Sequence, residues 1–197
     1  MRPWALVSAT VAPVSLIGGW TVAATRQPPG YDAVRDTISA LAAHGATDRW
    51  VMTTGLAVLG VSHVVTALGL DDARPLGRLL LGAGGVTAAL VAVFPQPSAA
   101  HFPVATASFV TLAGWPAASG LPSGRSALLA STGLLGALGW LGVEVGGGDL
   151  LGLSERVVAG AEALWPLAVV VALRRTQMTR SVITSPGCPG PHPRRTR

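Results

Sequence analysis

Long apolar stretches are the feature that most constrains the fold of this chain. Six of them, at residues 3–25, 50–70, 76–94, 102–120, 126–145 and 156–173, are separated by short polar breaks. About 20 apolar residues in a helix are enough to cross the hydrocarbon core of a bilayer, which is about 30 Å thick. Only 12% of the residues are charged, whereas ordinary soluble domains carry about 25%. The sequence therefore predicts an all-α membrane protein with six transmembrane helices in one domain, residues 1–175.

The two ends of the chain need separate interpretation. Residues 3–25 follow Arg2 and end in small residues, so a cleaved signal peptide is the alternative to a first spanning helix. The length of the apolar run favours the spanning helix. At the other end, Arg174 and Arg175 are expected to stop the last helix. Residues 176–197 are rich in proline, glycine and arginine without apolar periodicity, which predicts a disordered tail.

Residues 28–50 form the longest polar interruption between the apolar stretches. Four apolar residues there fall on one stripe of a helix: Tyr31, Val34, Ile38 and Leu41. The pattern predicts a short amphipathic helix of about 13 residues, with Asp32 capping its first turn and Gly45 its end. At roughly 20 Å it is too short to span a bilayer. It is either a connector on the membrane surface or a lid over a cavity between the spanning helices.

The arginines predict the orientation in the membrane. With six spans, seven lie on the side of the termini, Arg2, Arg74, Arg78, Arg125, Arg174, Arg175 and Arg180, and four on the other, Arg26, Arg35, Arg49 and Arg156. Cytoplasmic loops carry the excess of positive charge. We therefore expect both termini and the tail in the cytoplasm, and residues 28–50 outside. The absence of lysine beside abundant alanine, glycine and valine suggests a bacterial cell membrane.

The formal charge of +5 does not require a nucleic-acid partner. Orientation and anionic lipid explain arginines beside apolar segments, so the expected partner is the lipid bilayer. Glycines in two apolar stretches predict close helix packing: Gly82, Gly84 and Gly85 in the third, and Gly133, Gly136, Gly139 and Gly142 in the fifth. The single Cys188 excludes a disulfide framework. The sequence does not indicate an oligomeric state.

Two ionisable residues lie inside apolar stretches, where charge is costly and polar groups mark candidate sites. Glu162 lies seven residues after Glu155, so both occupy one helix face and form a polar stripe from the outer surface inward. Glu162 either joins two helices through hydrogen bonds or forms the floor of a cavity that accepts protons. His63 lies roughly 20 Å deep and is expected to form a hydrogen bond between helices. The different depths argue against direct pairing of His63 with Glu162.

A metal site is a weaker prediction at the outer mouth. Eight side chains could converge there: Asp32, Asp36, His44, Asp48, His101, Glu144, Asp149 and Glu155. Histidine and carboxylate ligands suit zinc and other divalent metals, and His44, His101 and Asp36 are the candidate ligands. His44 and His101 are also the only pair that could serve a haem. No HExxH or HxxxH spacing is present, and the sequence predicts no particular cofactor.

Three segments carry a resemblance to a known family: residues 31–63, the Phe94-Pro95 turn with His101-Phe102, and GLSERV at residues 152–157. Together they resemble the six-helix prokaryotic membrane family catalogued as domain of unknown function 998. The resemblance implies a six-helix multi-pass membrane protein without an assigned activity. It also implies that Asp32, Ser39, His101, Glu155 and Arg156 belong to a characteristic outer-face set.

Three functions are compatible with these features. The leading hypothesis is a protein that binds or transports a small molecule or lipid through an outward-facing polar cavity. Its candidate residues are Asp32, Ser39, His101, Glu155, Arg156 and Glu162. The first alternative is a structural or regulatory membrane partner without a ligand. The second is a membrane-embedded metal-dependent enzyme, although the sequence identifies no reaction and no catalytic residue. His101, Glu155 and Arg156 are expected to form one cluster, with Arg156 paired to a carboxylate.

Overall fold

The computed structural model describes the backbone of residues 1–184 and the side chains of residues 1–179. All secondary structure in this part is helical. In chain order the helices are α1 (Ala5–Ala24), α2 (Ile38–Ala42), α3 (Trp50–Gly69), α4 (Pro75–Val93), α5 (His101–Ser119), α6 (Gly124–Val145) and α7 (Leu151–Thr184). The predicted all-α architecture is confirmed.

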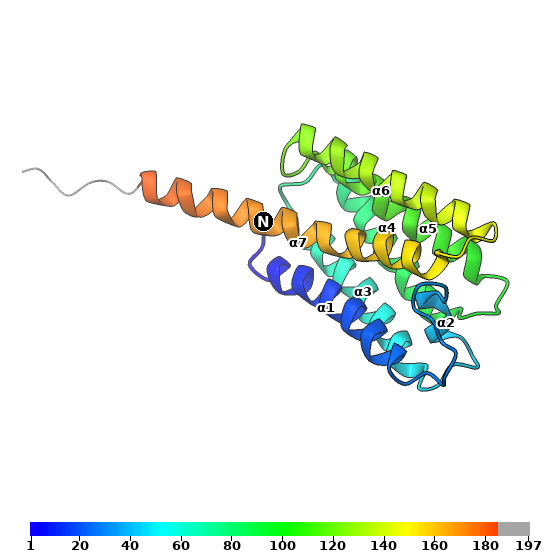
Figure 1. The fold of residues 1–197 in the computed structure, drawn as a ribbon. Helices are drawn as coiled ribbons and strands as arrows, with labels where there is room; N and C mark the ends of the chain where they lie inside the picture. The colour runs from blue at the N-terminus through cyan, green and yellow to red at the C-terminus, as the bar shows by residue number, and fades with distance from the viewer. Residues whose placement is uncertain (185–197) are drawn as a thin grey trace, which may run out of the picture.

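The six long helices lie side by side (Figure 1), and their contacts close a ring. Each packs against its neighbours in the order α1, α3, α4, α5, α6 and α7, and α7 returns to pack against α1. The α1–α3 connection, the α4–α5 turn and the α6–α7 turn lie at one end of the ring, together with α2 (Figure 1). We call this the α2 end. The N-terminus and the two other turns lie at the opposite end.

Five of the six long helices are long and apolar enough to cross a membrane: α1, α3, α4, α6 and α7. The chain is therefore a multi-pass membrane protein. The remaining long helix, α5, has 19 residues and packs between α4 and α6. Its apolar character is diluted by His101, two prolines and several serines and threonines.

Small residues allow close packing on the α3 and α4 side of the ring. A Cβ added at Gly85 would lie 2.6 Å from the Gly60 carbonyl oxygen, and one added at Gly84 would lie 2.6 Å from the Leu112 side chain. The close approach predicted for these two positions is confirmed, whereas Gly82 has only an ordinary contact with Ala67. The packing face predicted on α6 is wrong within this chain. A Cβ at Gly133, Gly136, Gly139 or Gly142 would meet no atom within 4 Å, and all four glycines are exposed.

The predicted amphipathic helix is much shorter than expected. Only residues 38–42 are helical; Thr37 caps them by accepting a hydrogen bond from the Ala40 amide, and Ala43 ends them in an extended conformation. The predicted caps at Asp32 and Gly45 are wrong. Asp32 instead accepts a hydrogen bond from the Val34 amide at 2.9 Å, a local bond of the kind that competes with helix formation.

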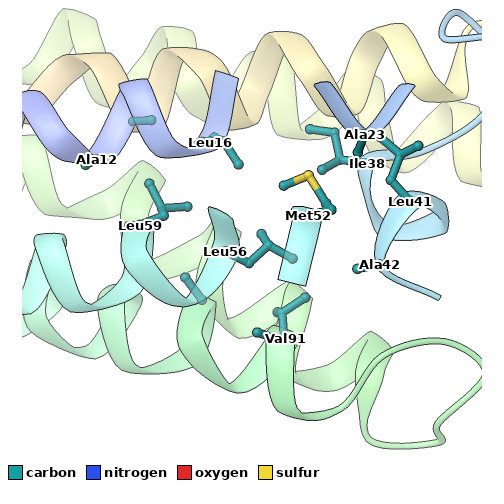
Figure 2. Packing of buried hydrophobic residues seen from close by; sticks show 13 residues of the cluster. Ala12, Leu16, Ala23, Ile38, Leu41, Ala42, Met52, Leu56, Leu59 and Val91 are labelled. Atoms are coloured by element: carbon teal, nitrogen blue, oxygen red, sulfur yellow. The ribbon is translucent and has the colours of Figure 1, made fainter. Parts of the chain in front are cut away.

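Part of the apolar stripe packs against the interior of the ring. Ile38 and Leu41 of α2 are buried in the same cluster as Leu16, Met52 and Leu56 (Figure 2). Tyr31 packs against this cluster while partly buried, and Val34 is exposed. The α2 helix therefore closes one end of the helix ring over its apolar interior.

The last helix is longer than predicted. Helix α7 runs through Arg174 and Arg175 to Thr184, so the expected stop at these arginines and the disorder of residues 176–184 are wrong. Arginine, glutamine and methionine are good helix formers, and no proline or glycine occurs between Pro166 and Pro186. Charge can end a membrane span without ending a helix. The predicted disorder of residues 185–197 lies outside the described residues.

Candidate functional site

Glu155 connects α7 to α2. It lies in the second turn of α7 with a side chain that is 7% exposed. Its carboxylate accepts hydrogen bonds from the Ile38 backbone N–H and, at 2.9 Å, from the Ser39 hydroxyl. The first amides of a helix have no partner within the helix, so a carboxylate from a distant part of the chain satisfies α2. Because α2 makes only five residues of helix, this bond helps to fix its position.

Arg156 holds the segment before α2. Its Nη1 donates to the carbonyl oxygens of Ala33 at 2.7 Å, Asp36 at 2.7 Å and Gly152 at 2.9 Å. Its Nη2 donates to the Tyr31 hydroxyl. These carbonyls are free because residues 31–36 are not helical. The predicted pairing of Arg156 with a carboxylate is therefore wrong: the guanidinium binds backbone oxygens and a phenol.

The Tyr31 hydroxyl belongs to the same contact. Burial raises the pKa of Tyr31, and the adjacent Arg156 guanidinium partly offsets this effect. The phenol therefore stays protonated.

The backbone of α7 also contacts the segment before α2: the Leu153 amide donates a hydrogen bond of 2.9 Å to the Val34 carbonyl oxygen. Two consecutive residues of α7 therefore hold different parts of the chain: Glu155 binds α2, and Arg156 binds residues 31–36.

A small cavity lies inside the ring, with a volume of about 50 Å³. Its walls come from α1, α2, α3, α4, α5 and α7 and are mainly apolar. Five polar side chains border it: Ser39, His63, Ser108, Glu155 and Glu162. We call it the inner cavity. A space of this size holds a few water molecules.

Two ionisable side chains face the inner cavity without a partner in the described structure. Glu162 is 2% exposed and His63 is 0% exposed. Glu162 Oε1 and both ring nitrogens of His63 have no hydrogen-bond partner among the described residues. The interhelical hydrogen bond predicted for His63 is therefore wrong for this part of the chain. A buried polar group without a hydrogen bond lowers the stability of the fold by about 1–3 kcal/mol. Buried groups left in this state are candidates for binding water or a ligand.

A larger groove of about 410 Å³ lies beside the inner cavity at the α2 end. It runs between α2, α5, α6 and α7, and exposed residues such as Phe102 and Gly142 border it. We call it the outer groove. Four residues border both spaces: Ser39, Ala105, Phe109 and Glu155. Glu155 thus stands where the outer groove meets the inner cavity.

His101 borders the outer groove as the first residue of α5. It is 6% exposed, and its Nδ1 lies 2.9 Å from the Phe94 carbonyl oxygen. Because a carbonyl oxygen only accepts, Nδ1 carries the proton in this contact. Of the three residues expected to form one cluster, His101 and Glu155 border this space and Arg156 does not.

The comparison with protein families agrees with the resemblance read from the sequence. The family model described as "Protein of unknown function (DUF998)" matches residues 10–172. The chain belongs to the DUF998 family. The matched range includes every residue that borders the inner cavity and the outer groove. No curated protein and no solved structure matches the chain, so function must be argued from the site itself.

The remaining candidate ligands of this DUF998 protein do not converge on a metal site. His44 contacts Arg49 at 2.9 Å, and Asp36 accepts the Asp32 amide at 2.7 Å. Other acidic residues of this end also have partners. Asp48 forms an ion pair with Arg26, and Asp149 forms one with Arg35. Glu144 accepts hydrogen bonds from Trp140 and from the Leu150 amide. Among the described residues, no three His, Cys, Asp or Glu side chains form a group that could hold a metal ion. Asp32 likewise lies apart from the groove.

Sequence reasoning missed three contributors to this DUF998 site. Ser108 and Phe109 border the inner cavity from α5, a helix whose serines and aromatics show no distinctive spacing. Tyr31 belongs to the predicted apolar stripe, but its hydroxyl accepts a hydrogen bond from Arg156, 125 residues away. No local signal in the sequence could have revealed that contact.

Proposed function

We propose that this DUF998 membrane protein binds a small amphipathic molecule in the outer groove, with Glu155 at the polar end of the bound molecule. The observation that carries the proposal is the meeting of the groove and the inner cavity at one buried carboxylate. Binding is the common step of a receptor and a transporter, and the same site would serve either.

The dimensions of the outer groove support a ligand site. Its volume of about 410 Å³ falls in the range of about 300–1,000 Å³ that is typical of small-molecule pockets. Such pockets combine mostly apolar walls with a few polar groups. Phe102, Phe109 and Leu141 supply apolar walls here, while Ser39 and Glu155 supply polar groups.

The unpartnered groups behind Glu155 give further support. Glu162 and His63 face the inner cavity, and buried polar groups are normally satisfied by protein, water or a ligand. Water in the inner cavity would satisfy both side chains when the site is free. A ligand whose polar end reaches Glu155 would meet this hydrated space.

The orientation is part of the proposal. Helix α5 packs along α4 and α6 and serves as the sixth span, which puts both termini on one side. Seven arginines against four, counted over Arg2, Arg74, Arg78, Arg125, Arg174, Arg175 and Arg180 against Arg26, Arg35, Arg49 and Arg156, favour the cytoplasm for the termini. The outer groove would then open toward the outside of a bacterial cell membrane.

The test compares two glycines of α6. Gly142 borders the outer groove and Gly139 does not, and a side chain at either position meets no atom within 4 Å at its Cβ. Gly142→Phe should fill the groove without disturbing the fold, and Gly139→Phe is the matched control. The protein is purified in lipid nanodiscs, and its thermal midpoint is measured with octylamine, octanol and octanoate.

A bound ligand raises the midpoint by mass action. We expect at least one of the three compounds to raise the midpoint of the wild type and of Gly139→Phe, but not that of Gly142→Phe. A rise of the same size in all three proteins would show that the compounds act on the lipid or elsewhere on the protein. That result, or no rise with any compound, would refute the proposal.

A second function rests on the glycine stripe of α6. Gly133, Gly136, Gly139 and Gly142 leave a surface without side chains that no described residue covers, and such surfaces allow another membrane helix to approach closely. A structural or regulatory partner would bind there. Cross-linking from cysteine at Gly136 should capture such a partner in membranes, and its absence in native membranes would remove this candidate.

A further inference from the structure

We infer that the polar end of the bound molecule is a primary ammonium group, held by the Glu155 carboxylate at the inner end of the outer groove. This inference rests on the proposed function and names the class of ligand. It depends on the charges around the two spaces, on the free acceptor sites of Glu155, and on the size of the inner cavity.

The charged groups around the site favour a cation. The titratable side chains that border the outer groove or the inner cavity are Glu155, Glu162, His63 and His101. No arginine borders either space within the described part of the chain, and the sequence contains no lysine. Two carboxyl groups therefore border these spaces with no arginine among the described bordering residues, while the Arg156 guanidinium acts on Glu155 electrostatically from outside both spaces.

The nearest guanidinium is engaged elsewhere. Arg156 follows Glu155 directly, yet its two terminal nitrogens bind Ala33, Asp36, Gly152 and Tyr31. It does not form an ion pair with Glu155. A cationic ligand would supply the ion-pair partner that Glu155 lacks among the described residues. An anionic ligand would place like charges together in a poorly hydrated space, which is costly.

Glu155 has acceptor sites left for such a ligand. An ionised carboxylate offers about four lone-pair sites; the Ile38 amide and the Ser39 hydroxyl use two of them, and the Ser39 amide also interacts with the carboxylate. An ammonium group has three N–H donors, so it can bind the remaining sites of Glu155 and one further acceptor. Phe109 also borders both spaces, and an aromatic face attracts a cation.

The size of the inner cavity distinguishes a primary from a quaternary ammonium. Its volume is about 50 Å³, which is enough for a few water-sized groups. An –NH₃⁺ group is about the size of a water molecule, whereas three methyl groups would fill the space and remove the N–H donors. The apolar part of the ligand would occupy the larger outer groove.

The experiment measures the affinity of the full chain in lipid nanodiscs for four octyl compounds: octylamine, trimethyloctylammonium, octanol and octanoate. Each affinity is corrected for partition into empty nanodiscs. A hydrogen bond to a charged group is stronger than a neutral one by an amount equal to about tenfold in affinity. We therefore expect octylamine to bind at least about tenfold more tightly than each of the other three compounds.

Two variants assign the effect to the carboxyl groups. Glu155→Gln should weaken octylamine binding by about tenfold or more and octanol binding by a smaller factor. If Glu155→Gln does not fold, Glu162→Gln is measured in its place. This substitution breaks no hydrogen bond of Oε1, because Glu162 Oε1 has no partner in the described structure. Glu162→Gln should weaken octylamine binding by several-fold, about threefold or more, and octanol binding by less.

The outcomes separate the two levels of the proposal. If octanol or octanoate binds as tightly as octylamine, and Gly142→Phe abolishes that binding, the ammonium inference is overturned and the groove remains a ligand site. Equal binding of trimethyloctylammonium would overturn the choice of a primary ammonium. If none of the compounds binds, or Gly142→Phe leaves all four affinities unchanged, the proposed function itself fails.

Discussion

Replacement of the two buried glutamates of α7 by leucine should have opposite effects on stability. Glu155 and Glu162 lie seven residues apart on one face of the same helix, and both border the inner cavity. In the described part of the chain, Glu155 alone of the two has hydrogen-bond partners, the Ile38 amide and the Ser39 hydroxyl. Glu162 Oε1 has none among the described residues. The same substitution therefore tests what these partners contribute.

The magnitudes follow from the cost of an unsatisfied buried group, about 1–3 kcal/mol. Glu155→Leu leaves two donors of α2 without their acceptor; since the Ser39 hydroxyl can rotate, we expect a loss of about 2–4 kcal/mol. Glu162→Leu removes a carboxyl group whose Oε1 has no hydrogen bond to any described residue. It should leave the free energy of unfolding unchanged or raise it by up to about 2 kcal/mol.

The assay is thermal unfolding followed by tryptophan fluorescence, with both variants and the wild type in the same lipid nanodiscs. For a chain of this size each kcal/mol shifts the midpoint by about 2–4 °C. Glu155→Leu should therefore unfold about 5–15 °C lower, and Glu162→Leu at the wild-type midpoint or above it. Equal losses in both variants would refute the contrast, because they would show that Glu162 has a stabilising partner as well.

Further expectations concern the α2 end and the orientation of the protein. Gly152→Ala should destabilise the fold by several kcal/mol, about 2–4, because its Cβ would lie 2.3 Å from the Asp36 carbonyl oxygen; a thermal midpoint within 2–3 °C of the wild type would contradict this. Since burial raises the pKa of Tyr31, the unfolded chain releases this proton first, so stability should fall as the pH rises above about 10. Tyr31→Phe should reduce this loss of stability at high pH. If stability depends on pH in the same way in the wild type and in Tyr31→Phe, the prediction is wrong. In cells, cysteine at Ser98 should react with an impermeant thiol reagent and cysteine at Ser123 should not; the reverse pattern would invert the orientation.

The sequence was most informative about features that repeat along the chain. Apolar length predicted the long helices, and the five-residue connection at residues 70–74 between α3 and α4 follows from their spacing. The seven-residue interval between Glu155 and Glu162 correctly indicated a shared helix face, since both border the inner cavity. These predictions depend only on helix geometry, which is the same in every context.

Predictions that depended on distant contacts were less successful. The stripe of Tyr31, Val34, Ile38 and Leu41 indicated a long helix, but Arg156 binds the carbonyl oxygens of residues 33 and 36. Those oxygens would have accepted hydrogen bonds within the predicted helix. The partner of this segment lies about 120 residues along the chain, beyond the reach of local propensity. Glycine spacing in α6 was equally ambiguous, because an exposed stripe and a packed one have the same sequence.

The most direct test of the central claim is whether the outer groove gives access to the inner end at Glu155. Ala105 borders both the groove and the inner cavity. Cysteine is introduced at Ala105 in a chain that carries Cys188→Ser, and its reaction with a small thiol reagent is measured in nanodiscs. We expect the cysteine to react, Gly142→Phe to slow the reaction by about tenfold or more, and Gly139→Phe to leave the rate unchanged. A cysteine that does not react, or that reacts at the same rate with the groove filled, would contradict the claim that ligands reach Glu155 through the outer groove.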